Sequence, residues 1–186
     1  MNLANFVTLL RLAMAPLIIW ALLIDQVVWA FAIFLIAGLS DAVDGIVARA
    51  FDQQSELGTL LDPIADKTLL VTVFIVLAYL GHIPLWLTIL VVSRDVLIIA
   101  GILICFVMGK PPQIKPLWVS KANTVAQISL ASLVLAALAL PLDMPLVQAA
   151  LVAITAVLTV ASAVAYIIQG IQHLSQDTTA SAVVTD

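Results

Sequence analysis

The sequence contains few charged side chains. Only 10% of its 186 residues are Asp, Glu, Lys or Arg, whereas a soluble domain carries about 25%. So few charges cannot cover the surface of a soluble protein of this length, and a soluble globular fold is excluded. Intrinsic disorder is also excluded, because the hydrophobicity is too high: 64% of the residues are hydrophobic and the mean hydropathy is +1.23. The remaining class is an integral membrane protein with several spans.

Cysteine and net positive charge are also scarce. The single Cys105 lies in an apolar stretch, which excludes a disulfide framework and a cysteine-based metal site. The formal net charge of −4 offers no basic footprint for nucleic acid, so no nucleic-acid partner is expected. No positive segment precedes Ala13–Ala15 and Arg11 interrupts the apolar run, so we expect no signal peptide. No Arg- and Ser-rich transit peptide is visible, which favours the bacterial inner membrane.

Apolar runs long enough to span a bilayer, about 20 residues each, can be placed six times in the chain. The uncharged stretch from Thr68 to Ser93 is too long for one span, and the turn-forming sequence Gly81–Pro84 divides it. The expected helices are approximately Phe6–Ile24, Val27–Val47, Leu57–Leu80, Pro84–Met108, Lys121–Leu140 and Leu146–Gln169. The sequence therefore predicts an all-α membrane protein with six transmembrane helices. Residues 1–174 form one membrane domain, and 175–186 form a polar, mobile tail.

The distribution of Lys and Arg predicts the orientation. Arg49 lies between the second and third helices, and Lys110, Lys115 and Lys121 lie between the fourth and fifth. The other three connections contain no Lys or Arg. By the positive-inside rule, the basic loops face the cytoplasm, so both termini are expected there.

Eight charged residues crowd into the segment from Asp41 to Lys67. Asp41 and Asp44 are three residues apart, and Asp62 and Asp66 are four apart, so each pair lies on one face of a helix. Both pairs flank the same short cytoplasmic connection. We therefore expect a polar cavity there, open to the cytoplasmic side, that gathers all four carboxylates.

Four carboxylates cannot all stay ionised at close range in a low-dielectric site without compensation. Carboxylate-only ligation suits hard divalent ions such as Mg²⁺ or Mn²⁺, and two such ions form the usual clamp for displacement at phosphorus. Arg49 offers a planar fork for a phosphate. A divalent-cation transporter is the alternative from another functional class. It is disfavoured because a transporter needs a pathway to the opposite side of the membrane, where the connections offer only Asp25, His82 and Asp143.

The same residues resemble a known family. The pattern Asp41-x2-Asp44-Gly45-x2-Ala48-Arg49-x8-Gly58-x3-Asp62-x3-Asp66 is similar, gap for gap, to the signature of the CDP-alcohol phosphatidyltransferases. The resemblance implies a six-helix membrane fold, a homodimer, two divalent metal ions and a CDP-diacylglycerol donor.

Residue roles follow from the resemblance position by position. Asp41, Asp44, Asp62 and Asp66 resemble the metal ligands, and Asp66 also resembles the general base that deprotonates the acceptor hydroxyl. The residues that resemble those holding the CDP group are Gly45, Arg49, Ser55 and Gly58 in the motif and Asn5, Thr8 and Arg11 near the N-terminus.

Resemblance to subfamilies bears on the acceptor alcohol. Ser93-Arg94-Asp95-Val96 and Ser120-Lys121-x2-Thr124-x2-Gln127 resemble the cardiolipin synthases of mitochondrial and alphaproteobacterial type. Phosphatidylglycerophosphate synthases look to carry further cations at the positions of Ile102 and Asn123. Phosphatidylglycerol has a single negative charge, for which Arg94 and Lys121 would suffice as acceptor ligands. The sequence thus favours phosphatidylglycerol, with glycerol-3-phosphate as the alternative acceptor. Because adjacent helix residues point some 100° apart, we also expect Arg94 to face the cavity while Asp95 pairs elsewhere.

Overall fold

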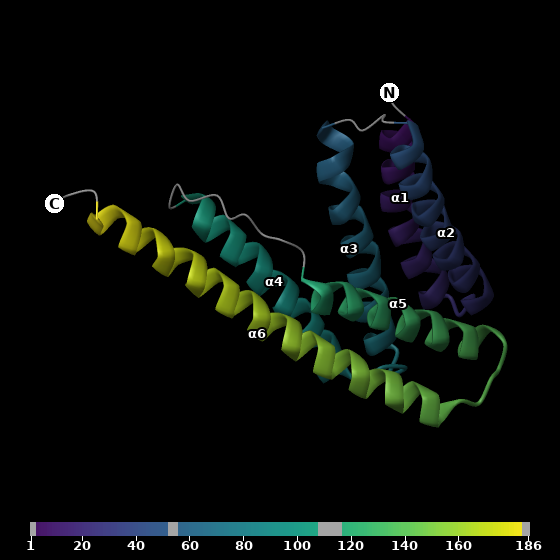
Figure 1. The fold of residues 1–186 in the computed structure, drawn as a ribbon. Coiled ribbons are helices and arrows are strands. Elements are labelled where there is room, and N and C mark those ends of the chain that lie inside the picture. Colours follow the sequence, from purple (N-terminus) through teal and green to yellow (C-terminus); the bar gives the residue numbers. More distant parts are fainter. Residues whose placement is uncertain (1–2, 52–55, 108–116, 184–186) are drawn as a thin grey trace.

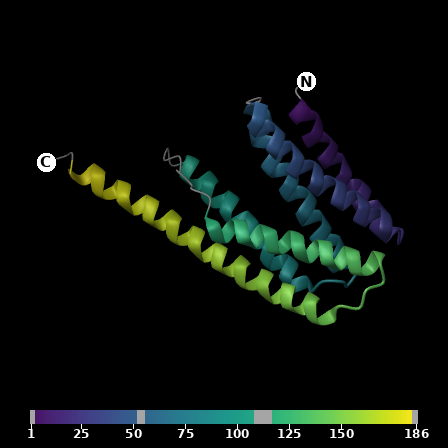
Figure 2. The same ribbon diagram turned by 45° about the vertical axis from the view of Figure 1, so that its right-hand side comes forward.

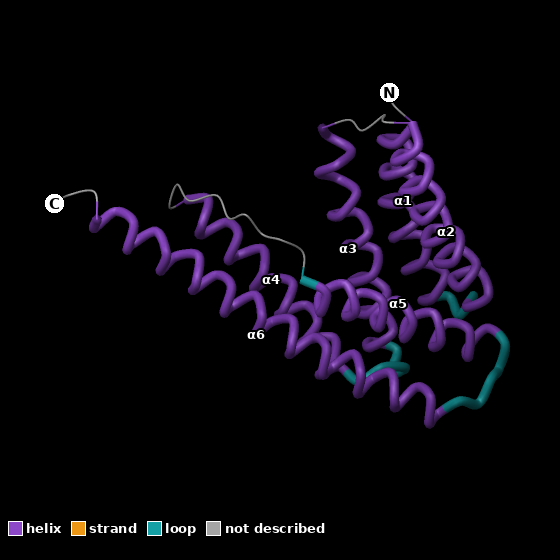
Figure 3. Tube along the Cα trace, in the orientation of Figure 1, coloured by secondary structure: helices purple, strands orange, loops and turns teal. Residues whose placement is uncertain are grey.

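The protein is all-helical in a computed structural model, which describes the backbone of residues 3–51, 56–107 and 117–183. Side chains are described over 10, 12–40, 67–104, 107 and 117–172. Six helices occupy these ranges: α1 (Leu3–Leu23), α2 (Val27–Phe51), α3 (Glu56–Tyr79), α4 (Leu85–Val107), α5 (Trp118–Ala139) and α6 (Pro145–Val183). No strand occurs within the described ranges, as the tube view shows (Figure 3).

The six helices lie where the apolar runs predict them, but two of them end later than expected. The sequence analysis ended the second helix near Val47 and the sixth near Gln169, whereas α2 continues to Phe51 and α6 to Val183. The expected ends marked where hydrophobicity falls, which limits a membrane span but not a helix. Residues 170–183 contain no proline, so the backbone hydrogen bonds of α6 continue.

Three described helices are long and apolar enough to cross a membrane: Leu85–Ile104, Trp118–Ala139 and Pro145–Gln172. The described parts of α1, α2 and α3 contribute shorter apolar segments, Leu12–Leu23, Val27–Ser40 and Lys67–Tyr79. Large apolar side chains such as Trp20, Ile36 and Val157 are exposed. This surface suits a lipid environment. The count of six spans and their orientation stay predictions.

The helices form two groups, which are joined by α5 and by a direct contact between α3 and α4 (Figure 1). In the first group α1 packs against both α2 and α3, and in the second α4 packs against α6. Helix α5 contacts α2, α3 and α6, and the turned view confirms its position between the groups (Figure 2). The core that joins them contains the fully buried Ile18, Phe74, Leu77, Leu87 and Leu130.

The connections after α1 and α3 close the helices by the same hydrogen-bond pattern. At the end of α3, Gly81 N–H donates to Ala78 O (3.1 Å) and His82 N–H to Leu77 O (2.9 Å), with Gly81 at φ +80°. This is the Schellman arrangement, which needs a left-handed residue. It confirms the predicted turn between the third and fourth helices. At the end of α1, Asp25 holds the equivalent position at φ +62°.

Replacing Asp25 with Gly is expected to stabilise the protein. A left-handed backbone costs an L-residue about 1–2 kcal/mol, and less for Asp than for most, while Gly costs about 0.5–1 kcal/mol of unfolded-state entropy. The expected net gain is about 0.5 kcal/mol, measured as a higher Tm in detergent micelles. The control is Asp143→Gly, at an exposed loop residue without positive φ. An equal rise in Tm for both variants would contradict the prediction.

Candidate active site

Polar side chains interrupt the inner faces of two otherwise apolar helices. Their spacings of three and four residues place each set on one helix face. The sets are Ser120, Asn123 and Gln127 on α5 and Thr155, Thr159 and Ser162 on α6. Every member except the partly buried Ser120 is buried. The packing of α5 against α6 therefore gathers polar groups inside the helix assembly.

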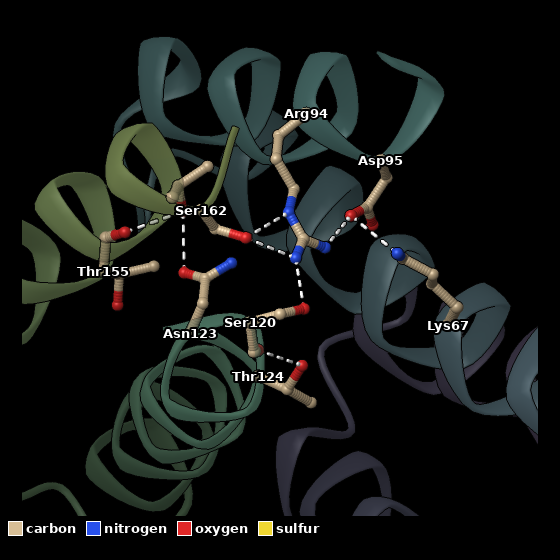
Figure 4. Close-up of polar contacts among 9 residues, drawn as sticks. Lys67, Arg94, Asp95, Ser120, Asn123, Thr124, Thr155 and Ser162 are labelled. Atoms are coloured by element: carbon tan, nitrogen blue, oxygen red, sulfur yellow. Dashed lines mark hydrogen bonds and ion pairs between the residues drawn. The ribbon is translucent and has the colours of Figure 1, made fainter. Parts of the chain in front are cut away.

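Arg94 of α4 is the centre of this polar region (Figure 4). Its side chain is 4% exposed, and Nε and Nη2 donate to Ser162 Oγ at 3.1 and 2.6 Å. Nη2 also donates to Ser120 Oγ, and Nη1 donates to Asp95 Oδ1 at 2.8 Å. The guanidinium carbon lies 5.6 Å from the ring centroid of Tyr166. Four of its five N–H groups thus have partners, and Arg94 ties α4 to both α5 and α6.

Asp95 bridges two cations. Its Oδ1 lies 2.8 Å from Arg94 Nη1 and 2.8 Å from Lys67 Nζ of α3. Asp95 thus pairs with another residue, Lys67, as expected, but its pairing with Arg94 was not expected. Adjacent residues do leave a helix in different directions, but the long stem of arginine curves back and its guanidinium reaches the neighbouring carboxylate. Asp95 is buried, so the two cations balance a carboxylate that would be costly alone.

Several buried polar atoms of α5 and α6 have no hydrogen-bond partner. Thr159 Oγ1 donates to Asn123 Oδ1 at 2.9 Å, although it also lies 2.7 Å from Thr155 O. Asn123 Nδ2, Gln127 Nε2 and Thr155 Oγ1 have no hydrogen-bond partner in the structure. An unpaired buried donor costs about 1–3 kcal/mol. Such atoms are candidates for contact with a ligand or water.

A pocket of about 510 Å³ lies beside Arg94, within the range of small-molecule sites. Helices α2, α3, α4 and α5 contribute to it. Its polar lining residues are Lys67, Arg94, Ser120, Thr124, Gln127 and Ser132, and its apolar ones include Phe34, Leu35, Leu39, Leu70 and Ile128. The pocket is therefore amphipathic, with two cations among its lining residues.

The pocket lies next to the aspartate motif in the chain. Lys67 directly follows Asp66, and Leu39 precedes Asp41 by two residues. With a rise of about 1.5 Å per residue, each lies within one helical turn of its aspartate. The pocket therefore adjoins the helical turns that carry Asp41 and Asp66.

The backbone brings the motif helices to one end of the molecule. Asp41 and Asp44 lie in α2, Asp62 and Asp66 lie in α3, and only residues 52–55 join the two helices. The N-terminal part of α1 lies at the same end in both ribbon views (Figures 1 and 2). Helical backbone at all four aspartates supports the face-sharing argument for each pair.

The side chains of the motif residues lie outside the described residues. This holds for the four aspartates and for Asn5, Thr8, Arg11 and Arg49. The surroundings of Gly45 and Gly58 are not described either, and Ser55 lies outside the described backbone as well. Among the described side chains, no group of three or more His, Cys, Asp or Glu residues is placed to hold a metal ion. As a donor set, four carboxylates on two adjoining helix ends fit Mg²⁺ or Mn²⁺.

Lys121 lies apart from the pocket lining. It is exposed, and its Nζ lies 5.1 Å above the ring centroid of Trp118. Lys67, which the sequence analysis counted only among the clustered charges, lines the pocket with a side chain that is 37% exposed. A role for Lys121 in acceptor binding stays a prediction, and Lys67 is the cation that sequence reasoning missed.

The sequence contained a signal for part of this region. Hydroxyl and amide residues at three- and four-residue spacing within apolar helices indicate an inward polar face. That pattern identifies Asn123, Thr155, Thr159 and Ser162 as candidates. It does not identify their partners, which depend on how α4, α5 and α6 pack.

Comparison with known proteins connects these features to one family. The sequence profile described as CDP-alcohol phosphatidyltransferase matches residues 1–161. The "Cardiolipin synthase (CMP-forming) / mitochondrial hydrolase fusion protein" of Schizosaccharomyces pombe is 36% identical over 182 residues, covering 90% of this chain and 31% of that protein. "Cardiolipin synthase (CMP-forming)" of Rattus norvegicus is 34% identical over 149 residues, covering 72% of this chain and 49% of that protein. "Probable phosphatidylglycerophosphate synthase" of Mycobacterium tuberculosis is 35% identical over 181 residues, covering 93% of this chain and 83% of that protein. The chain thus spans less than half the length of the first two relatives.

Proposed function

Because the chain belongs to the CDP-alcohol phosphatidyltransferase family, we propose that it transfers a phosphatidyl group from CDP-diacylglycerol to phosphatidylglycerol. The products are cardiolipin and CMP. The observation that carries this choice of acceptor is the amphipathic pocket beside the aspartate motif. A lipid acceptor needs apolar lining for its acyl chains, whereas glycerol-3-phosphate would make no use of Phe34, Leu35 and Leu70.

The charges in the pocket also favour phosphatidylglycerol. Lys67 and Arg94 share the carboxylate of Asp95, so the three groups together carry one net positive charge. A phosphodiester carries one negative charge, whereas glycerol-3-phosphate carries a phosphate monoester with up to two. Lys67 and Arg94 therefore match the acceptor lipid, with Lys121 as a further ligand at the exposed start of α5.

The proposed reaction is a displacement at the β-phosphorus of CDP-diacylglycerol. Asp66 accepts the proton of the terminal hydroxyl of phosphatidylglycerol, and the acceptor oxygen forms a bond to that phosphorus. The bond from phosphorus to the bridging oxygen breaks, and CMP leaves with the electron pair. Asp41, Asp44, Asp62 and Asp66 would hold two Mg²⁺ or Mn²⁺ ions, which supply positive charge beside the pyrophosphate.

The other motif residues hold the donor. Gly45 and Gly58 let the nucleotide approach the helix backbone closely, and Arg49 binds phosphate through its planar fork. Ser55, Asn5, Thr8 and Arg11 complete the CDP site. We also propose a homodimer in the bacterial inner membrane, with residues 1–174 as the catalytic domain.

An assay of CMP release tests this function. The purified protein in mixed micelles receives CDP-diacylglycerol and Mg²⁺ with phosphatidylglycerol, with glycerol-3-phosphate or without an acceptor. We expect CMP and cardiolipin only with phosphatidylglycerol. CMP only with glycerol-3-phosphate would assign the protein as a phosphatidylglycerophosphate synthase, the function that the similarity to the Mycobacterium tuberculosis protein favours. No CMP with any alcohol would reopen the interpretation as a divalent-cation transporter.

A further inference from the structure

We propose that, in the pocket formed by α2, α3, α4 and α5, the side-chain amide of Gln127 recognises an ester carbonyl oxygen in the diacylglycerol part of the acceptor phospholipid. The proposal rests on the proposed function, because it places one substrate of that reaction in the fold. It also assigns a specificity-determining role to a residue outside the aspartate motif.

Gln127 is a pocket-lining residue whose side-chain Nε2 is a buried donor without a hydrogen-bond partner. The residue is 4% exposed and lines the pocket, yet its Nε2 makes no hydrogen bond in the structure. An amide N–H in this environment is strongly unfavourable unless an acceptor reaches it. A ligand that brings an oxygen to Nε2 therefore gains binding energy that a purely apolar ligand does not.

The chemistry of the pocket indicates which ligand this is. Lys67 and Arg94 provide cationic groups for a phosphate, and Phe34, Leu70 and Ile128 provide apolar lining. Diacyl phospholipids carry acceptor oxygens between the phosphate and the hydrocarbon chains, in their ester groups. Gln127 lines the same pocket as both kinds of residue, so an ester carbonyl is the acceptor that the pocket suits.

Positions along α5 agree with this order. Ser120 accepts a hydrogen bond from Arg94 and therefore marks the cationic end of the pocket. Gln127 follows seven residues later, about 10 Å along the helix axis and on the same face. A lipid phosphate near Lys67 and Arg94 thus directs its glycerol esters along α5 towards Gln127.

Ether-linked phosphatidylglycerol tests the proposal, because it keeps the phosphate and the chains but lacks the ester carbonyl oxygens. Binding of ester-linked and ether-linked phosphatidylglycerol to the full-length protein in detergent micelles is compared by native mass spectrometry. We expect wild-type protein to bind the ester form about tenfold more tightly, the effect of one hydrogen bond in a buried site. Gln127→Met, which keeps the side-chain length but has no N–H, is expected to bind both forms equally.

The matched control is Ser129→Ala. The Ser129 hydroxyl is exposed and donates within α5 to Val125 O at 2.8 Å, so this variant should keep the tenfold preference. Equal binding of the two lipids by wild-type protein would overturn the proposal without depending on how any variant folds. An ester preference that survives in Gln127→Met would overturn it as well. A loss of affinity of that variant for CDP-diacylglycerol instead of phosphatidylglycerol would assign the pocket to the donor.

Turnover separates this inference from the proposed function. If wild-type protein releases no CMP with phosphatidylglycerol, the proposed function fails, while the binding comparison still decides the role of Gln127. If cardiolipin forms but the Gln127→Met variant shows no rise in KM for ester-linked phosphatidylglycerol, the function stands and the inference fails.

Discussion

Replacing Asp66 with Asn is expected to lower CMP release by at least about 10³-fold. The proposed role of Asp66 is to accept the proton of the acceptor hydroxyl, and a positioned general base contributes about 10²–10⁴-fold to a rate. The same change removes a carboxylate from a set of four that would hold two divalent ions, so the loss exceeds that of the base alone. CMP release with CDP-diacylglycerol, phosphatidylglycerol and saturating Mg²⁺ measures the effect.

The control for this prediction is Asp143→Asn. Asp143 lies in the exposed connection between α5 and α6, and its replacement should leave turnover within about twofold. Both variants should elute from size-exclusion chromatography like the wild-type protein. Turnover of Asp66→Asn within tenfold of the wild-type rate would remove Asp66 from the role of base.

Replacing Asp95 with Asn is expected to lower the free energy of unfolding by about 3 kcal/mol. Asp95 Oδ1 pairs with both Arg94 and Lys67, so Asn leaves two cations near each other without their counter-charge. Removing one partner of a buried ion pair costs about 3–5 kcal/mol. We expect the lower end of that range, because the Lys67 side chain is 37% exposed and water screens part of its charge. Reversible unfolding in mixed micelles measures the difference.

A double variant identifies the physical cause. Lys67→Met removes one of the two cations, so Asp95→Asn should cost less in the Lys67→Met background than in the wild-type protein. Such non-additivity is expected for residues that share one network. Equal costs in both backgrounds would show that the effect of Asp95→Asn does not arise from the uncompensated charges.

Much of the fold could be predicted because its determinants are local. Helix formation in lipid depends on the length of apolar runs, since every backbone group must find its partner within the helix. The runs predicted all six helices, and Gly81 marked the turn that divides the third from the fourth. The same reasoning predicted an end for α6 that is too early. A loss of hydrophobicity limits a membrane span, whereas a helix continues until a residue breaks its backbone hydrogen bonds.

The candidate site was predictable only in part. The aspartate motif is a matter of spacing within two helices, and spacing can be read along the chain. The partners of Arg94 could not be read in this way. Ser120 and Ser162 lie 26 and 68 residues away in sequence and meet Arg94 through the packing of α4, α5 and α6. The pairing with Asp95 depends on a side-chain rotamer, which no helical angle predicts.

The sequence alone thus determines that the protein suits a membrane, where its helices form and where its charges cluster. These features depend on hydrophobic length and residue spacing, which are properties of single segments. The packing of helices creates the Lys67–Asp95–Arg94 bridge and the pocket where Gln127 Nε2 lacks a partner. These features need side chains from several helices within about 3 Å of one another or around one cavity. Helix crossing geometry and rotamers set such distances, and neither is encoded in the spacing of residues along one helix.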